Sequence, residues 1–202
     1  MSNTVDNSKR RFLTTAASVV VGGAGAAAVA VPFVASMLPS AKARAAGAPI
    51  KVDISKLQPG QLIRPEWQGK PVWILRRSEE VISDLTTLDE QLLDPASAIE
   101  EQQPDYCQNP ARSIREDVIV LVGICTHLGC SPIHVPKLEA ESKNLGSEWK
   151  GGFTCPCHGS KFDLAGRVYK GVPAPTNLVV PPHYFIDDNL ILVGEHAPKG
   201  VA

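Results

Sequence analysis

The sequence predicts a mostly β protein in which a single N-terminal transmembrane helix precedes a small antiparallel β-sandwich head. A long uncharged segment lies near the N-terminus, and short β-prone runs bounded by turn residues follow it. The 202 residues include 16 glycines and 17 prolines, against five phenylalanines, three tryptophans and three tyrosines. This composition is typical of a loop-rich β fold, and the length suits one domain with an appended segment.

The charge balance and the apolar fraction exclude two classes of protein. The chain has 20 basic and 21 acidic side chains, a formal net charge of -1, and 44% hydrophobic residues. A basic surface that neutralises phosphates is therefore not expected, so we expect no nucleic-acid partner. The apolar fraction is high enough to build a core, which argues against a disordered chain.

The N-terminal segment is predicted to be an export signal followed by a membrane anchor. From Phe12 to Ala41 no side chain is charged. As a helix rising about 1.5 Å per residue, this run exceeds the roughly 30 Å hydrocarbon core of a bilayer. The preceding residues Ser8 to Leu13, SKRRFL, resemble the twin-arginine export signature. We expect residues 1–11 to be a cytoplasmic signal and residues 12–38 to be a transmembrane anchor.

Two fates are open for this anchor, cleavage or retention. The small-residue triplets within residues 41–45, AKARA, are compatible with a cleavage site. A cleavable core is usually about 7 to 15 residues long, much shorter than this run, so the sequence favours a retained anchor. Pro32 can kink the helix. Residues 39–50 are mostly small, which predicts a flexible tether between the anchor and the head.

The head is expected to span residues 51–202. Three short apolar runs, at residues 72–75, 118–122 and 190–193, are predicted to be its strands. A helix is expected to begin at Ser78 and to run towards Leu93, where Asp94 and Pro95 stop it.

Two compact loops of the head contain four of the five cysteines. The first loop is residues 125–130, CTHLGC, and the second is residues 155–160, CPCHGS. Together they offer six possible ligands, more than the four of an ordinary metal site. Some of these side chains therefore do something else, and in an oxidising compartment one cysteine of each loop can pair as a disulfide. A structural zinc site is the alternative that the residues alone leave open.

Both loops resemble the cluster-binding loops of the Rieske iron-sulfur proteins of cytochrome bc complexes, and the resemblance extends over the anchor, the tether and the head. Oxygenase-type Rieske proteins share only part of these two motifs, because they lack the second cysteine of each loop. The resemblance implies one [2Fe-2S] cluster, bound within about residues 123–176. It makes Cys125 and Cys155 the ligands of one iron and His127 and His158 the ligands of the other. It also implies a Cys130–Cys157 disulfide.

This ligand set has chemical consequences that can be argued from charge. Two ferric ions, two sulfides and two thiolates sum to zero, so an added electron meets less repulsion than in an all-thiolate cluster, and the potential rises. The hydroxyl of Ser160 and the backbone near Gly129 and Gly159 can donate hydrogen bonds to sulfur, which stabilises the reduced state. Electron uptake also favours proton uptake at the imidazoles of His127 and His158.

The resemblance further implies a function, the iron-sulfur subunit of a bacterial ubiquinol:cytochrome c oxidoreductase. Such a subunit takes an electron from quinol at cytochrome b and passes it to the haem of the cytochrome c subunit. His158 is implied as the quinol contact, with Leu128 packing beside it. The head would lie in the periplasm, anchored to the inner membrane. The alternatives are an exported Rieske subunit of another oxidoreductase, such as arsenite oxidase, and a periplasmic zinc-binding module.

Two positions depart from the family pattern. Residues 171–175, GVPAP, are similar to the proline-rich loop that covers the cluster in this family, with Val172 inserted. Phe162 stands where many respiratory relatives have tyrosine, which removes a phenolic hydrogen bond to a ligand sulfur and predicts a lower potential. The fifth cysteine, Cys107, lies outside both loops and is expected to be buried and inert.

Overall fold

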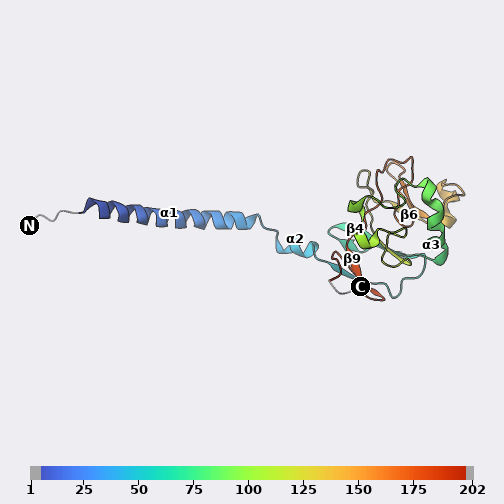
Figure 1. Ribbon diagram of the computed structural model, residues 1–202, viewed down its shortest axis with the longest axis horizontal. Helices are drawn as coiled ribbons and strands as arrows, with labels where there is room; N and C mark the ends of the chain where they lie inside the picture. The colour runs from blue at the N-terminus through green and yellow to red at the C-terminus, as the bar shows by residue number, and fades with distance from the viewer. Residues whose placement is uncertain (1–5, 199–202) are drawn as a thin grey trace, which may run out of the picture. The chain divides into compact units, whose positions relative to one another are not determined.

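The computed structural model describes residues 6–198 and divides the chain into two units, of which the first ends at Ala45 and the second begins at Ala46 (Figure 1). The first unit contains α1 (Asn7–Ser36) and most of α2 (Ala41–Ala46). The second unit, the head, contains ten strands within the described residues. The predicted fold class, one N-terminal apolar helix and a mostly β head, is confirmed.

Helix α1 is capped by Asp6, begins at Asn7 and continues through Pro32. The Asp6 carboxylate accepts the N–H groups of Ser8 at 3.1 Å and Lys9 at 3.4 Å, which caps the first turn. Within the stretch Asn7–Ala45, an 18-residue window reaches a mean hydropathy of 2.0, and by length and composition the stretch suffices to cross a membrane. Within the expected tether, residues 39–50, Ala41–Ala46 is helical and Ile50 already begins the first strand.

The head contains three small antiparallel sheets. The first has the order β1-β10-β9, and in the second β4 pairs with β2, β3 and β5. The third has the order β6-β7-β8. The strands are β1 (Ile50–Asp53), β2 (Leu62–Ile63), β3 (Glu66–Trp67), β4 (Lys70–Arg76), β5 (Val118–Val122), β6 (Ile133–Val135), β7 (Gly152–Thr154), β8 (Lys161–Phe162), β9 (His183–Asp187) and β10 (Leu190–Val193).

Strands β4 and β5 form a central layer that is covered on both faces. Successive side chains of a strand point to opposite faces. On one face, Ile74 and its partner Val120 pack in a core with residues of β1 and β10. On the other face, Trp73 and its partner Leu121 pack in a second core with residues of the two cysteine-bearing loops. Burial on both faces explains why these strands are continuous apolar runs.

The helical connection after β4 is shorter than predicted. Helix α3 (Glu79–Leu85) begins at the expected position, where the Ser78 hydroxyl accepts the Val81 N–H at 3.4 Å. The α-helix ends at Leu85 and continues as the 3-10 helix η1 (Thr86–Gln91), so the prediction of one helix to Leu93 is wrong. Leu85 and Leu88 are both buried, and their spacing of three matches the 3-10 period. The remaining short 3-10 helices are η2 (Glu100–Gln102), η3 (Asp105–Cys107), η4 (Lys137–Glu139) and η5 (Glu141–Lys143).

Candidate metal centre

The two cysteine-bearing loops have the same backbone hydrogen bonding. In the first, the Cys125 N–H donates to the Cys130 carbonyl at 2.7 Å. In the second, the Cys155 N–H donates to the Ser160 carbonyl, also at 2.7 Å. Cys125 and Cys155 therefore occupy equivalent positions, and so do Cys130 and Ser160. This equivalence is not visible in the order of cysteines and histidines along the chain.

A glycine closes each loop in the same way. The N–H groups of Gly129 and Gly159 donate to the carbonyls of Cys125 and Cys155, at 3.0 Å and 2.9 Å. Both glycines have positive φ, +82° and +76°, a conformation that favours glycine because it has no Cβ. Each loop is therefore a tight turn that presents its first cysteine towards the interior.

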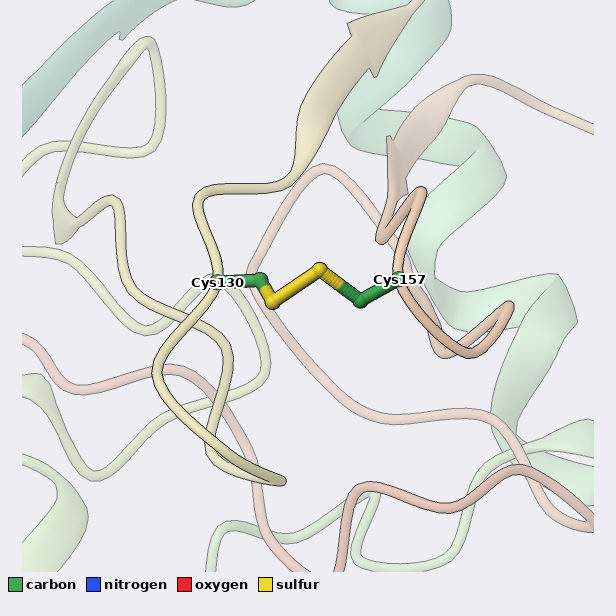
Figure 2. The surroundings of a disulfide bond; sticks show 2 residues. All are labelled: Cys130 and Cys157. Atoms are coloured by element: carbon green, nitrogen blue, oxygen red, sulfur yellow. A yellow bond between two sulfur atoms is a disulfide. The ribbon is translucent and has the colours of Figure 1, made fainter.

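A disulfide between Cys130 and Cys157 joins the two loops, and Figure 2 shows it crossing from one to the other. The three remaining cysteines are free and buried, and two of them, Cys125 and Cys155, belong to the loops. The sulfur atoms of Cys130, Cys155 and Cys157 lie within 4.8 Å of one another. Because two of these three sulfurs are bonded to each other, the thiols available to a metal in the loops are Cys125 and Cys155.

The two histidines of the loops lie side by side. The ring centroids of His127 and His158 are 4.8 Å apart, and the rings are nearly perpendicular, at 87°. His158 is exposed and His127 is half-buried. Leu128, which follows His127 in the first loop, has 71% of its surface exposed. The site therefore has a buried side with two thiols and a solvent-facing side with two imidazoles and a leucine.

The surroundings of Cys125 act on its pKa in both directions. Burial raises the pKa of the Cys125 thiol above its ordinary value, as does the neighbouring Cys155, whereas the His127 backbone N–H and the Ser160 hydroxyl act to lower it. The Ser160 oxygen also accepts the Ala174 N–H at 3.0 Å, so its own hydrogen is available to the sulfur. These donors favour the thiolate, which is the form that binds metal.

The proline-rich segment, residues 171–175, is attached to both loops. The Ala174 N–H binds the second loop through Ser160, as described above. From the first loop, the Thr126 hydroxyl donates to the Thr176 carbonyl at 2.7 Å. The extra residue Val172 packs partly buried against the core that contains Cys125 and Cys155. A third loop thus closes one side of the site.

Two family models match this chain. One, described as the Rieske [2Fe-2S] domain, matches residues 52–182. The chain belongs to the Rieske iron-sulfur family. The other model, described as "Ubiquitinol-cytochrome C reductase Fe-S subunit TAT signal", matches residues 1–40.

Curated relatives place the chain within the iron-sulfur subunits of cytochrome bc complexes. The "Ubiquinol-cytochrome c reductase iron-sulfur subunit" of Allochromatium vinosum is 58% identical over 189 residues, 94% of this chain and 90% of that protein. The protein of the same name from Blastochloris viridis is 41% identical and covers 96% of both chains. Among solved structures, a chain of "Hyperthermophilic respiratory Complex III" is similar with a TM-score of 0.48 and 28% identity, covering 89% of this chain and 97% of that chain.

The donor set of the Rieske head fits the family's [2Fe-2S] cluster. Two free buried thiols occupy equivalent turns, and two imidazoles lie 4.8 Å apart beside them. A Rieske centre requires two cysteines on one iron and two histidines on the other. The disulfide accounts for the two cysteines that such a centre does not use.

One position that the sequence did not single out controls the approach to the first loop of the Rieske head. Gly123 lies two residues before Cys125, and its N–H donates to the Pro71 carbonyl at 2.7 Å. A Cβ at Gly123 would lie 2.3 Å from the indole ring of Trp73, closer than carbon atoms can approach. Trp73 in turn stacks on Phe153, with ring centroids 4.7 Å apart. A close contact between segments distant in sequence leaves no signal in composition or periodicity.

We expect Gly123→Ala to displace the first loop of the Rieske head and to change the spectrum of the cluster, because the added methyl group collides with Trp73. Low-temperature electron paramagnetic resonance of the reduced protein checks this through the g values. Trp73→Leu in the same chain should restore the original spectrum in part, since it makes space for the methyl. Gly25→Ala is the control, because nothing lies within 4 Å of a Cβ there and its helical backbone accepts alanine without strain. An unchanged spectrum in Gly123→Ala contradicts this prediction.

Phe162 of the Rieske head is buried in the same core as Cys125 and Cys155, at 0% exposure. We expect Phe162→Tyr to raise the midpoint potential, because a phenolic hydrogen bond to a ligand sulfur stabilises the reduced state. The rise is roughly 40 mV for each kcal/mol of hydrogen bonding, since about 59 mV is tenfold for one electron. A redox titration measures the shift, and an unchanged or lower midpoint counts against the prediction.

Proposed function

We propose that this chain is the subunit of a bacterial ubiquinol:cytochrome c oxidoreductase that accepts electrons from quinol beside cytochrome b and delivers them to the haem of the cytochrome c subunit. The observation that supports it best is the pairing of two buried free thiols with two adjacent imidazoles at the solvent-facing end of the head. The names of the close relatives agree with this function.

We assign the ligands residue by residue. Cys125 and Cys155 hold one iron, and His127 and His158 hold the other. When bound, the cluster supplies a one-electron centre that is neutral in its oxidised form and therefore has a high potential. Around it, the Ser160 hydroxyl and the His127 N–H donate to the Cys125 sulfur and stabilise added negative charge.

The exposed end of the head is suited to contact quinol. His158 is exposed, and the ring nitrogen that does not bind iron can accept the hydrogen of a quinol hydroxyl. Leu128 offers an apolar surface beside it, with 71% of its area exposed. Quinol gives up a proton with each electron, so an imidazole whose free nitrogen is unprotonated beforehand can take the proton as the electron leaves the substrate.

The N-terminal segment supports a membrane location. We propose that residues 12–38 cross the inner membrane with the basic residues 1–11 in the cytoplasm, which places the head in the periplasm. The match of residues 1–40 to a TAT signal and the apolar helix α1 agree with this placement. The disulfide Cys130–Cys157 is also typical of an oxidising compartment.

Motion of the head requires a flexible tether, and residues 39–50 are the segment proposed to supply it. We expect that replacing residues 39–49, which precede β1, by a rigid proline run slows quinol:cytochrome c turnover, because the head can no longer move between its two partners. The spectrum of the cluster should stay unchanged. Turnover assays and electron paramagnetic resonance on the same membranes check both points. Normal turnover with the rigid segment contradicts a moving head.

The experiment that tests the proposed function is electron paramagnetic resonance of the reduced membrane fraction with and without a quinol-site inhibitor. We expect a Rieske signal whose line shape changes when the inhibitor is added. A signal whose line shape does not change when the inhibitor is added favours an exported Rieske subunit of another oxidoreductase, such as arsenite oxidase. Zinc without iron or acid-labile sulfide in the purified protein would overturn the redox function.

A further inference from the structure

Two arginines of the head are buried without a carboxylate partner. Arg77 is 2% exposed and Arg112 is 0% exposed. Within residues 6–198, no carboxylate lies within the 4.0 Å ion-pair distance of either guanidinium. A buried charge without a counter-charge is rare in proteins, because transfer of an ion from water is costly. These two side chains therefore call for an explanation.

Neutral oxygen atoms hold both guanidinium groups. Arg112 donates to the Gln103 side chain at 2.9 Å and to three carbonyls, and its Nε has no partner. Arg77 donates to the Ser113 hydroxyl at 2.7 Å and to three further carbonyls. Burial lowers the pKa of each guanidinium to about 10, so both stay charged at neutral pH.

A third buried arginine, Arg167, differs from these two because it forms ion pairs with carboxylates. Arg167 pairs with Asp163 at 2.8 Å, and both side chains are 0% exposed. It also contacts Asp89 at 3.0 Å. Arg167 is thus paired directly, whereas the nearest carboxylates, Asp163 among them, act on Arg77 and Arg112 only from beyond ion-pair distance. Three buried arginines against one buried aspartate still leave the interior of the head positively charged.

The guanidinium groups of Arg77 and Arg112 both bind the segment that leads directly from the second ligand loop. Arg77 donates to the Leu164 carbonyl at 3.5 Å and Arg112 to the Ala165 carbonyl at 3.1 Å. Leu164 follows Ser160 by four residues, which a fully extended chain spans in about 14 Å at most. Leu164 and Ala165 also belong to the same core as the two free loop cysteines. The positive charge therefore lies close to the proposed centre.

We propose that Arg77 and Arg112 raise the reduction potential of this Rieske head by placing buried positive charge, without a direct carboxylate partner, next to the segment that follows the second ligand loop. The inference rests on the proposed function, since it requires the cluster to be bound by the two loops. Reduction adds one negative charge at the site, and buried positive charge stabilises it. Adding the carbonyl contact to the extended span from Ser160 places the charge at most about 20 Å from the second loop. A unit charge about 20 Å away, at an effective dielectric constant of about 20, changes electron affinity about fourfold. For one electron this is about 35 mV.

The test is a redox titration of the purified full-length protein, followed by electron paramagnetic resonance. Arg112→Gln should lower the electron affinity about fourfold, whereas Arg112→Lys, which keeps the charge, should change it much less. Arg77→Gln should act in the same direction as Arg112→Gln and serves if that variant does not fold. The g values should stay unchanged in each variant, which separates a charge effect from a rearranged ligand loop. Arg115→Gln is the control, because Arg115 already pairs with Asp117 at 2.8 Å and is 32% exposed.

Three results would overturn the inference. One is a midpoint in the glutamine variants equal to that of the unmodified protein. Another is an equal fall in Arg112→Gln and Arg112→Lys, which would indicate a structural effect. The third is an equal fall in Arg115→Gln. If the unmodified protein itself has no Rieske signal, the proposed function fails instead, so the two failures are distinguishable.

Discussion

Replacing either Cys125 or Cys155 by serine is expected to abolish the iron-sulfur centre, whereas replacing both Cys130 and Cys157 by alanine is expected to leave it assembled. The reason is that two of the four loop cysteines are available to bind iron and the other two form a disulfide. Cys125 and Cys155 are free, buried and at equivalent positions of two similar turns, while Cys130 and Cys157 are joined to each other. A thiolate ligand cannot be replaced by a serine hydroxyl of much higher pKa without losing the iron.

The measurement is iron and acid-labile sulfide per purified chain, together with the spectrum of the reduced protein. The serine variants should contain neither iron nor sulfide. The double alanine variant should retain a cluster but unfold at a lower temperature, because the disulfide closes a loop of 27 residues in sequence separation. On the chain-entropy model this loss costs about 3 to 4 kcal/mol. Cys107→Ser serves as the control and should leave the cluster content unchanged, because Cys107 is also free and buried in the same core but lies outside both loops. Iron and sulfide retained in Cys125→Ser would refute the assignment.

The elements that could be predicted from the sequence are those with a local signal. Strands β4, β5 and β10 are short apolar runs between turn residues, and each was expected close to its observed position. The long apolar helix has an unmistakable length and composition. The two ligand loops are visible because thiol and imidazole groups at short spacing have few other uses. Which cysteines pair, however, could be inferred only from the family resemblance.

Features that depend on contacts between distant segments could not be predicted. The end of α3 at Leu85 reflects the burial of Leu88 on a 3-10 turn, a tertiary choice that overrides the expectation of one longer helix. The collision that keeps position 123 a glycine involves Trp73, fifty residues earlier in the chain. The burial of Arg77 and Arg112 is hidden in the same way, because an arginine in a sequence is ordinarily expected at the surface.

The turn after β8 contains a buried ion pair between Asp163 and Arg167, and its loss is expected to have a large effect on stability. One Asp163 oxygen accepts the N–H groups of Ala165 and Arg167, at 2.9 Å and 2.7 Å, and the other accepts Arg167 Nε at 2.8 Å. Both charged side chains are fully buried. Asp163→Asn keeps the shape but removes the negative charge, which leaves the Arg167 guanidinium with the partly exposed Asp89 alone. We expect a loss of about 3 to 5 kcal/mol in the free energy of unfolding, since one partner of a buried pair stays charged.

Thermal unfolding of the full-length protein in detergent, followed by circular dichroism, measures this loss. Asp117→Asn is the matched control, because Asp117 also pairs with an arginine at 2.8 Å but is 38% exposed. An exposed pair contributes roughly 1 kcal/mol or less, so the control should unfold near the temperature of the unmodified protein. Equal destabilisation by the two substitutions would show that the Asp163 charge has no special role. A large loss in Asp163→Asn alone would show that the buried ion pair stabilises the turn after the second ligand loop. Strand β8 connects Ser160 of that loop directly to Asp163, so the turn supports the loop as well.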